Sequence, residues 1–217
     1  MKCNYCSGRC IKKGWHKQAQ KYQCKICGKC QQATYIYQKY AVDIDTQIVS
    51  LNNEGVGVNS ISRLLKIPRT TVLRRMMKAA SRIVQPACIE QGQPYEIDEL
   101  YTYVGSKDRP CYIIYVINRI TRKIIDFVIG ARTKENIKRL VDKLMLFFPK
   151  RIYTDNLNIF PLLIPASIHR THQYKTNRIE RKNLTIRTHL KRLSRKTICY
   201  SKSVAMLEAS VRLYMFG

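Results

Sequence analysis

Two cysteine pairs near the start of the chain constrain its fold more than any other feature. Cys3 and Cys6 form one Cys-x2-Cys motif, and Cys24 and Cys27 form a second after residues 7–23. Each motif can present two thiolates from a tight turn to one tetrahedral zinc ion, and four ligands close a structural site. We therefore predict a zinc ribbon over residues 1–36, with a set of buried free thiols as the alternative.

The other cysteines indicate the compartment rather than the site. The chain has 9 cysteines, and most of them lie near its start. Because their number is odd and they are clustered, metal binding in a reducing compartment fits better than disulfide pairing. Cys10, Cys30 and His16 are additional potential ligands, and we expect them to be bystanders of the four-cysteine site. The start of the chain lacks an apolar targeting segment, and its longest apolar run, 111–117, is too short to span a bilayer. We expect a cytosolic protein.

The charge of the chain indicates its partner. Forty Lys and Arg residues against 14 Asp and Glu residues give a net charge of +26. Such an excess destabilises a compact chain through self-repulsion unless a polyanion is its usual partner, which favours nucleic acid. An anionic membrane surface would require a lipid anchor or a long amphipathic face, so we expect no membrane partner.

Residues 41–84 show helical periodicity in three runs, interrupted at Gly55 and Gly57 and again at 67–68. The short connection 66–68 between the last two runs is typical of a helix-turn-helix, whose final helix enters the major groove of DNA. A basic, solvated face on an ordinary helical hairpin is the alternative. The side chains of the final helix expected to contact DNA are Arg69, Thr70, Arg74, Arg75 and Lys78.

Residues 85–94 contain two prolines and a glycine and are expected to be a linker, after which the pattern changes to β. Strands are predicted over 95–104, 111–118, 123–129 and 151–154 and around 168–171, with helices over 134–148 and from about 175 to 194. The order βββαβ, followed by a further strand and helix, is similar to that of the RNase H-like fold. We therefore expect an α/β domain with a mixed sheet over residues 95–217.

Three acids of this domain form a candidate catalytic set. Asp98 lies within the first strand, Asp155 ends the fourth, and Glu180 lies early in the last helix, the only acid between residues 156 and 207. Mg²⁺ prefers hard oxygen ligands, and two-metal phosphodiester chemistry needs several carboxylates at one point. A strand acid facing solvent is the alternative for Asp98, and a helix salt bridge is the alternative for Glu180.

Basic and polar residues follow Glu180 on the same helix. Asn183 and Arg187 share a helical face with Glu180, and Lys191 follows them. We expect these three side chains to contact DNA phosphates near the cut. A generic basic face is the alternative for each of them.

The chain resembles the insertion-sequence-one family of bacterial transposases over nearly its whole length. The matching segments are 3–6 with 22–29, 98–105, 153–155 and 178–184 followed by Arg187, and the separation of Asp155 and Glu180 also agrees. The resemblance assigns Asp98, Asp155 and Glu180 as the DDE acids. The chain departs from the family's pattern at Tyr101, where relatives carry Trp, and at Cys30–Gln31.

The resemblance implies a transposase with a structural zinc ion and two catalytic Mg²⁺ ions. It would bind the terminal inverted repeats of its own element and the target DNA, as a homo-oligomer in the DNA complex, in the nucleoid of the bacterial cytosol. Two other functions share these features. One is a DNA-binding regulator whose RNase H-like domain is inactive. The other is a nuclease that cuts DNA without strand transfer, which has the same active site.

Overall fold

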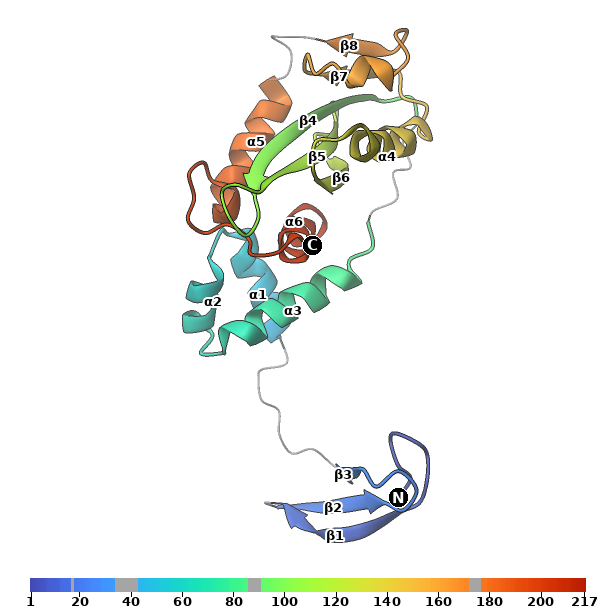
Figure 1. The fold of residues 1–217 in the computed structure, drawn as a ribbon, viewed down its shortest axis with the longest axis vertical. Helices are drawn as coiled ribbons and strands as arrows, with labels where there is room; N and C mark the ends of the chain where they lie inside the picture. Colours follow the sequence, from blue (N-terminus) through green and yellow to red (C-terminus); the bar gives the residue numbers. More distant parts are fainter. Residues whose placement is uncertain (17, 34–42, 86–90, 172–176) are drawn as a thin grey trace. The chain divides into compact units, whose positions relative to one another are not determined.

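The computed structural model describes residues 1–16, 18–33, 43–85, 91–171 and 177–217. The chain divides into two compact units, Met1–Ile44 and Asp45–Gly217 (Figure 1). The segment expected between the zinc ribbon and the helices, and half of the expected linker 85–94, lie outside the described residues. The borders of the expected domains therefore stay predictions.

The first unit is a small antiparallel sheet with a minimal core. Its strands β1 (Cys10–His16), β2 (Ala19–Cys24) and β3 (Cys30–Gln32) pair in the order β1-β2-β3. The buried cluster of this unit consists of three cysteines, Cys3, Cys10 and Cys24, with Tyr22 packed against them. So small an apolar core cannot offset the entropy of ordering the segment, so a further cross-link is needed.

The second unit begins with three helices, α1 (Ile44–Asn53), α2 (Val58–Leu64) and α3 (Arg69–Arg82). Residues 65–68 connect α2 to α3, and Lys66 adopts a left-handed conformation there with φ of 52°. The Ser62 hydroxyl donates a hydrogen bond of 2.6 Å to the carbonyl of Ile67, which closes the turn. The apolar side chains that follow the helical period form the buried interior: Ile44, Ile48, Ile61, Ile67, Val72, Met76 and Ala80.

A five-stranded mixed sheet forms the centre of the second unit. Its strands are β4 (Pro94–Tyr103), β5 (Pro110–Asn118), β6 (Ile124–Gly130), β7 (Arg151–Thr154) and β8 (His169–Thr171). They lie in the order β6-β5-β4-β7-β8, and β5 is antiparallel to the others. In order of appearance this is 3-2-1-4-5 with the second strand reversed, the topology of the RNase H-like fold. The expected fold class is confirmed.

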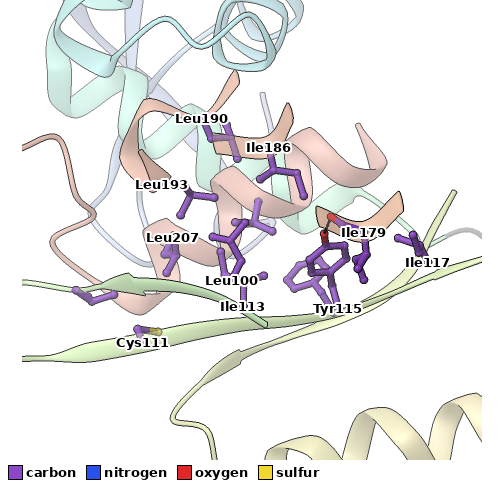
Figure 2. Packing of buried hydrophobic residues seen from close by; sticks show 13 residues of the cluster. Leu100, Cys111, Ile113, Tyr115, Ile117, Ile179, Ile186, Leu190, Leu193 and Leu207 are labelled. Atoms are coloured by element: carbon purple, nitrogen blue, oxygen red, sulfur yellow. Dashed lines mark hydrogen bonds between the residues drawn. The ribbon is translucent and has the colours of Figure 1, made fainter. Parts of the chain in front are cut away.

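Helices cover both faces of this sheet (Figure 1). Helix α4 (Lys134–Met145) packs Ile137, Leu140, Val141 and Leu144 onto one face. On the other face lie α5 (Asn177–His189) and α6 (Val204–Phe216). Figure 2 shows Ile179, Ile186 and Leu190 of the α5 region packed over Leu100, Ile113 and Tyr115 of the sheet. These apolar side chains form the buried side of the helix.

The end of α5 corrects the predicted helix of about 175 to 194. The helix ends at His189, because Leu190 takes an extended conformation with ψ of 91° and a 3-10 turn follows at Lys191–Leu193. This turn buries Leu193 against the sheet. The predicted start of the helix at Lys175 lies outside the described residues. Similarly, α4 ends at Met145, three residues before the predicted end at Phe148.

Helix α6 has no counterpart among the elements predicted from the sequence. This helix lies between the sheet and α3 (Figure 1), and its buried side chains include Met206, Leu207, Val211 and Leu213. Since both of its sides are covered, apolar residues occur around most of its circumference, and the helical period is weak. The Ser203 hydroxyl accepts a hydrogen bond from the Met206 N–H and caps its start.

The three helices and the RNase H-like domain are joined by close contacts besides the α3–α6 packing. Gly55, in the turn between α1 and α2, has a φ of +77°, and a Cβ atom there would lie 2.4 Å from the carbonyl oxygen of His189 at the end of α5. The Asn53 side chain also donates a hydrogen bond of 3.4 Å to the carbonyl of Leu213. A glycine is therefore required at position 55 both for its conformation and for this contact.

Candidate functional site

The two Cys-x2-Cys motifs meet in one cluster. The Sγ atoms of Cys3 and Cys27 are 3.6 Å apart, those of Cys6 and Cys24 are 3.5 Å apart, and all four lie within 4.8 Å of one another. Zn–S bonds of about 2.3 Å in a tetrahedron place sulfur atoms about 3.8 Å apart. A disulfide would require about 2.05 Å. The four cysteines therefore fit a single tetrahedral metal ion.

The turns around these cysteines favour thiolates. The main-chain N–H groups of Cys27 and Ile26 donate to the Cys24 sulfur, at 3.5 and 3.3 Å, and lower the pKa of Cys24 to about 6. The pKa of Cys6 is instead raised to about 12: the Gly8 main chain lowers it, but the neighbouring Cys24 and Cys27 thiols and burial outweigh this effect. Without a cation the four sulfur atoms do not all ionise readily, which is expected of a metal site.

The three other potential ligands are not part of the four-cysteine group, although Cys10 packs against Cys3 and Cys24. Cys10 is buried, and its thiol is 3.9 Å from the carbonyl of Gly8. Cys30 is exposed on β3, and the His16 ring is 3.3 Å from the Gln32 amide. Among the residues that the structure describes, the group that could hold a metal contains only the four predicted cysteines.

The three predicted acids lie on three neighbouring elements, where the end of β7 runs beside the middle of β4 and α5 covers the sheet. Strands β4 and β7 are parallel with Glu96 opposite Tyr153, and Asp98 and Asp155 follow two residues further along each chain. Asp98 alternates with Ile97 and so faces α5, whose first turn carries Glu180. Asp98 is half-buried, whereas Asp155 and Glu180 are exposed. The order of the elements thus brings all three acids to the same region.

The electrostatics connect these acids. Burial raises the pKa of Asp98 to about 6; hydrogen bonds from Glu99 N–H and Asn183 lower it, and the negative charges of Asp155 and Glu180 raise it further. The carboxylate oxygens of the three acids do not form a group within 4.8 Å in the described part of the chain. The charges of Asp155 and Glu180 therefore reach Asp98 although the three acids do not form one tight group.

Asp98 is oriented by neighbours that were not predicted from the sequence. The Glu99 N–H donates a hydrogen bond of 2.7 Å to Asp98 Oδ1, and the Asn183 amide donates one of 2.6 Å to Oδ2. The hydroxyl of Tyr115 donates to the Asn183 Oδ1 at 2.8 Å. Asn183, expected to contact DNA, thus has both ends of its amide engaged within the chain. A tyrosine within the apolar run 111–117 was a weak signal of such a link.

Two further acids of β4 lie near the site. Glu99, on the opposite face of the strand from Asp98, is 3.4 Å from Arg132, and burial raises its pKa to about 7, with Asp155 raising it and Arg132 lowering it. Glu96 is fully buried, and its carboxylate is 3.5 Å from Arg119. Burial raises the pKa of Glu96, which the arginine partly opposes. The density of acids in 96–99 was visible in the sequence, but their basic neighbours were not.

The predicted DNA-contacting residues differ in their exposure. On α3, Arg69, Thr70, Arg74 and Lys78 are exposed, whereas Arg75 forms an ion pair of 2.5 Å with Asp45 of α1. Lys191 is exposed as well. The Arg187 guanidinium is half-buried and donates to the carbonyls of Leu193 and Tyr101, at 2.6 and 3.2 Å. Arg187 therefore links α5 to the following turn and to β4.

A basic hollow of about 370 Å³ lies on the flank of α5 away from Glu180. Ile117 of β5 and Thr185 of α5 are among the residues that line it. The charged residues that line it are all basic: Arg122, Arg178, Arg181 and Lys182. Such a concentration of positive charge attracts anions.

The helices that the structure describes were also compared with the length and hydropathy of a membrane span. None of them meets both requirements.

Comparison with known proteins is consistent with this geometry. The family model described as IS1 transposase matches residues 94–216. The insertion element iso-IS1n protein InsB of Shigella dysenteriae is 37% identical over 120 residues, which cover 55% of this chain and 92% of that protein. The insertion element IS1 4 protein InsB of Escherichia coli strain K12 is 33% identical over 120 residues, 55% of this chain and 72% of that protein.

Two solved integrase structures are also similar. One is the HTLV-2 integrase catalytic core domain in complex with magnesium, in a trimeric form, with 16% identity, a TM-score of 0.38, and coverage of 57% of this chain and 86% of that one. The other is the simian T-cell lymphotropic virus intasome in complex with a PP2A regulatory subunit, with 14% identity and a TM-score of 0.38. That match covers 77% of this chain and 65% of the other.

An RNase H-like domain with acids on its two adjacent strands β4 and β7 and on α5, matched along its length by a transposase model, defines an enzyme of the DDE nuclease and transposase class. The chain belongs to the IS1 transposase family, as its sequence motifs predicted.

Proposed function

We propose that this protein is a DNA transposase that binds the terminal inverted repeats of its own insertion sequence and performs Mg²⁺-dependent strand cleavage and strand transfer. One observation carries the proposal. The three acids lie on different elements: Asp98 on β4, Asp155 at the end of β7 and Glu180 in the first turn of α5. The negative charges of Asp155 and Glu180 nevertheless both raise the pKa of Asp98. Acids that repel one another in one region of the sheet are stabilised by bound cations.

These three acids would hold two Mg²⁺ ions. Carboxylate oxygens are the hard ligands that Mg²⁺ prefers, and water and phosphate oxygens would complete the coordination of each ion. Bound there, the ions would activate a water or 3′-hydroxyl and stabilise the leaving oxygen of the scissile phosphate. The exposure of Asp155 and Glu180 leaves the site accessible to a DNA strand.

The remaining predicted features fit the same function. Cys3, Cys6, Cys24 and Cys27 would hold a structural Zn²⁺ ion. Helices α2 and α3 would act as the helix-turn-helix, with exposed Arg69, Thr70, Arg74 and Lys78 of α3 contacting double-stranded DNA. Lys191 and the basic hollow beside α5 would contact the phosphate backbone.

Transposition requires two ends of one element to be processed together, so we propose that a homo-oligomer acts in the DNA complex. Each end would then meet one set of the three acids. An insertion sequence resides in chromosomal DNA, so we propose that the protein works in the nucleoid of the bacterial cytosol.

The test of this function is a strand-transfer assay. A linear DNA carrying the element's terminal repeats is incubated with the purified full chain, a target plasmid and either Mg²⁺ or Ca²⁺. We expect nicked or joined plasmid products with Mg²⁺ only, because Ca²⁺ accepts looser coordination than the near-octahedral geometry of Mg²⁺. The matched control is a linear DNA of the same length with scrambled ends.

The products separate this function from its two alternatives. Cleavage at the repeats without joined products would indicate a nuclease. Specific binding of the repeats with neither cleavage nor joining would indicate a DNA-binding regulator with an inactive domain. Joining of the scrambled ends as efficiently as the true ends would contradict recognition of the terminal repeats.

Two neighbouring arginines of α3 are expected to behave differently. Arg74→Ala should weaken binding to the terminal repeats by about 1–3 kcal/mol and binding to random DNA by less, since an exposed arginine can read base edges. Arg75→Ala should mainly lower the melting temperature, because it breaks the ion pair with Asp45. Fluorescence anisotropy on both DNAs and thermal unfolding measure the two effects.

The matched control for this pair is Arg82→Ala, which removes an exposed arginine from the last turn of the same helix. It should leave the preference for terminal repeats unchanged. Equal losses on the two DNAs for Arg74→Ala would assign this residue to the phosphate backbone instead.

A further inference from the structure

The two oxygens of Asp98 are each held by one donor. The Glu99 N–H donates to Oδ1 at 2.7 Å and the Asn183 Nδ2 donates to Oδ2 at 2.6 Å. An ionised carboxylate has about four acceptor positions, so each oxygen keeps a lone pair for another partner. The plane of the carboxylate is therefore fixed while both oxygens remain able to bind a cation.

The orientation of the Asn183 amide follows from chemistry. An ionised carboxylate only accepts hydrogen bonds, so the NH2 group of Asn183 must face Asp98 and its Oδ1 must face away. That Oδ1 receives the hydroxyl of Tyr115 at 2.8 Å. A flipped amide would set two acceptors against each other at Asp98, so the carboxylate decides the orientation of the amide, and the Tyr115 hydroxyl holds the outward-facing Oδ1 in place.

Tyr115 occupies a position that does not otherwise require a hydroxyl. It lies on β5 directly opposite Asp98 in the strand register and is fully buried among the side chains of Figure 2. Its hydroxyl also lies 3.4 Å from the carbonyl of Ile179, the longer of its two contacts. A phenylalanine would fill the same volume without burying a polar group, which costs free energy unless it is hydrogen-bonded. The hydroxyl therefore serves the link to Asn183.

We propose that Tyr115 and Asn183 are positioning residues that hold the Asp98 carboxylate in the orientation needed to bind a divalent cation. The link Tyr115–Asn183–Asp98 joins β5, α5 and β4, so it also fixes the helix that carries Glu180 relative to the strand that carries Asp98. This inference rests on the proposed function, because it treats Asp98 as a metal ligand. Asn183 then acts inside the protein rather than on DNA.

The test measures metal binding directly. Mn²⁺ alone is titrated into the full, zinc-containing chain by calorimetry, and Asp98→Asn defines the loss of the site. Asn183→Ala is expected to weaken Mn²⁺ binding by about 10- to 100-fold, the usual effect of removing a hydrogen-bond partner of a metal ligand. Tyr115→Phe is expected to weaken it by about 5-fold, since one hydrogen bond is lost and the ring is kept. Terminal-repeat binding should not change.

A double-mutant cycle separates this role from general stability. If Tyr115 acts only through Asn183, then Tyr115→Phe in the Asn183→Ala background causes no further loss of Mn²⁺ affinity. Tyr103→Phe is the matched control, because the buried hydroxyl of Tyr103 donates to the carbonyl of Thr197 and has no link to Asp98. Tyr103→Phe should lower thermal stability but not Mn²⁺ affinity. If Asn183→Ala fails to fold, Asn183→Leu keeps the volume of the side chain.

Two results would overturn the inference. One is a Mn²⁺ affinity equal to that of the wild type in both Tyr115→Phe and the Asn183 variant. The other is a double variant whose loss of Mn²⁺ affinity, as a free energy, equals the sum of the losses in the two single variants. Failure of the proposed function looks different. A wild-type chain that binds Mn²⁺ through Asp98 but joins no DNA would contradict the transposase, while the affinities of the variants would still decide the roles of Tyr115 and Asn183.

Discussion

Asp98→Asn, Asp155→Asn and Glu180→Gln are each expected to reduce DNA cleavage and strand transfer by on the order of a thousandfold or more while leaving terminal-repeat binding intact. Each change keeps the shape of the side chain and removes one negative metal ligand. Charge stabilisation by the metal ions contributes several kcal/mol to the transition state, and each 1.36 kcal/mol corresponds to a factor of ten in rate. Gel-based strand-transfer assays and anisotropy measure the two properties.

DNA binding should survive these substitutions, because α3 lies outside the acid site and removal of a negative charge reduces repulsion of phosphate. Glu208→Gln is the matched control. Glu208 lies on α6, where its carboxylate is 3.0 Å from Arg212, and this substitution should leave strand transfer near the wild-type level. Strand transfer retained in Glu180→Gln would remove Glu180 from the catalytic set, and Glu99, which lies close enough to Asp155 to sense its charge, would be the next acid to test.

Cys24→Ser is expected to unfold the first unit, residues 1–44, without unfolding the second. The buried cluster of this unit consists of three cysteines, and Cys24 is one of them. Structural zinc contributes about 10–16 kcal/mol of apparent binding free energy at neutral pH, far more than such a core can replace. We expect the zinc content to fall, and hydrogen exchange to become fast in β1, β2 and β3 while β4 and β5 stay protected.

Cys30→Ser is the control within the same unit. Cys30 is exposed on β3 and lies outside the four-cysteine group, so this variant should keep one zinc ion and its protection from exchange. The assigned ligand set would be contradicted if Cys24→Ser kept its full zinc content and slow exchange. It would also be contradicted if Cys30→Ser lost as much zinc and protection from exchange as Cys24→Ser.

The local patterns of the sequence predicted most of the fold. The β-strand pattern placed each of the first four strands of the second unit to within one residue at either end, and 151–154 agreed at both ends. These patterns succeed because a strand or helix with one covered face repeats its apolar residues with a fixed period. The same reasoning failed for α6, which is covered by the sheet on one side and by α3 on the other and so lacks a clear period.

By itself, the sequence determined which chemical groups the protein carries and the approximate element on which each lies. The Cys-x2-Cys spacing, the excess of positive charge and the three acids are local or compositional properties, and reading them requires no partner. Membership of the IS1 transposase family followed from the same motifs.

The tertiary structure alone decided what each polar group meets. Periodicity set Asn183 and Arg187 on the face of Glu180, but their partners, Asp98 and the Tyr101 carbonyl, lie more than 80 residues away in the chain. A hydrogen bond is made or lost over a few tenths of an ångström, and only the packing of α5 on the sheet fixes positions that finely. For the same reason the sequence showed Arg74 and Arg75 as equivalent, whereas the fold pairs Arg75 with Asp45 and leaves Arg74 exposed.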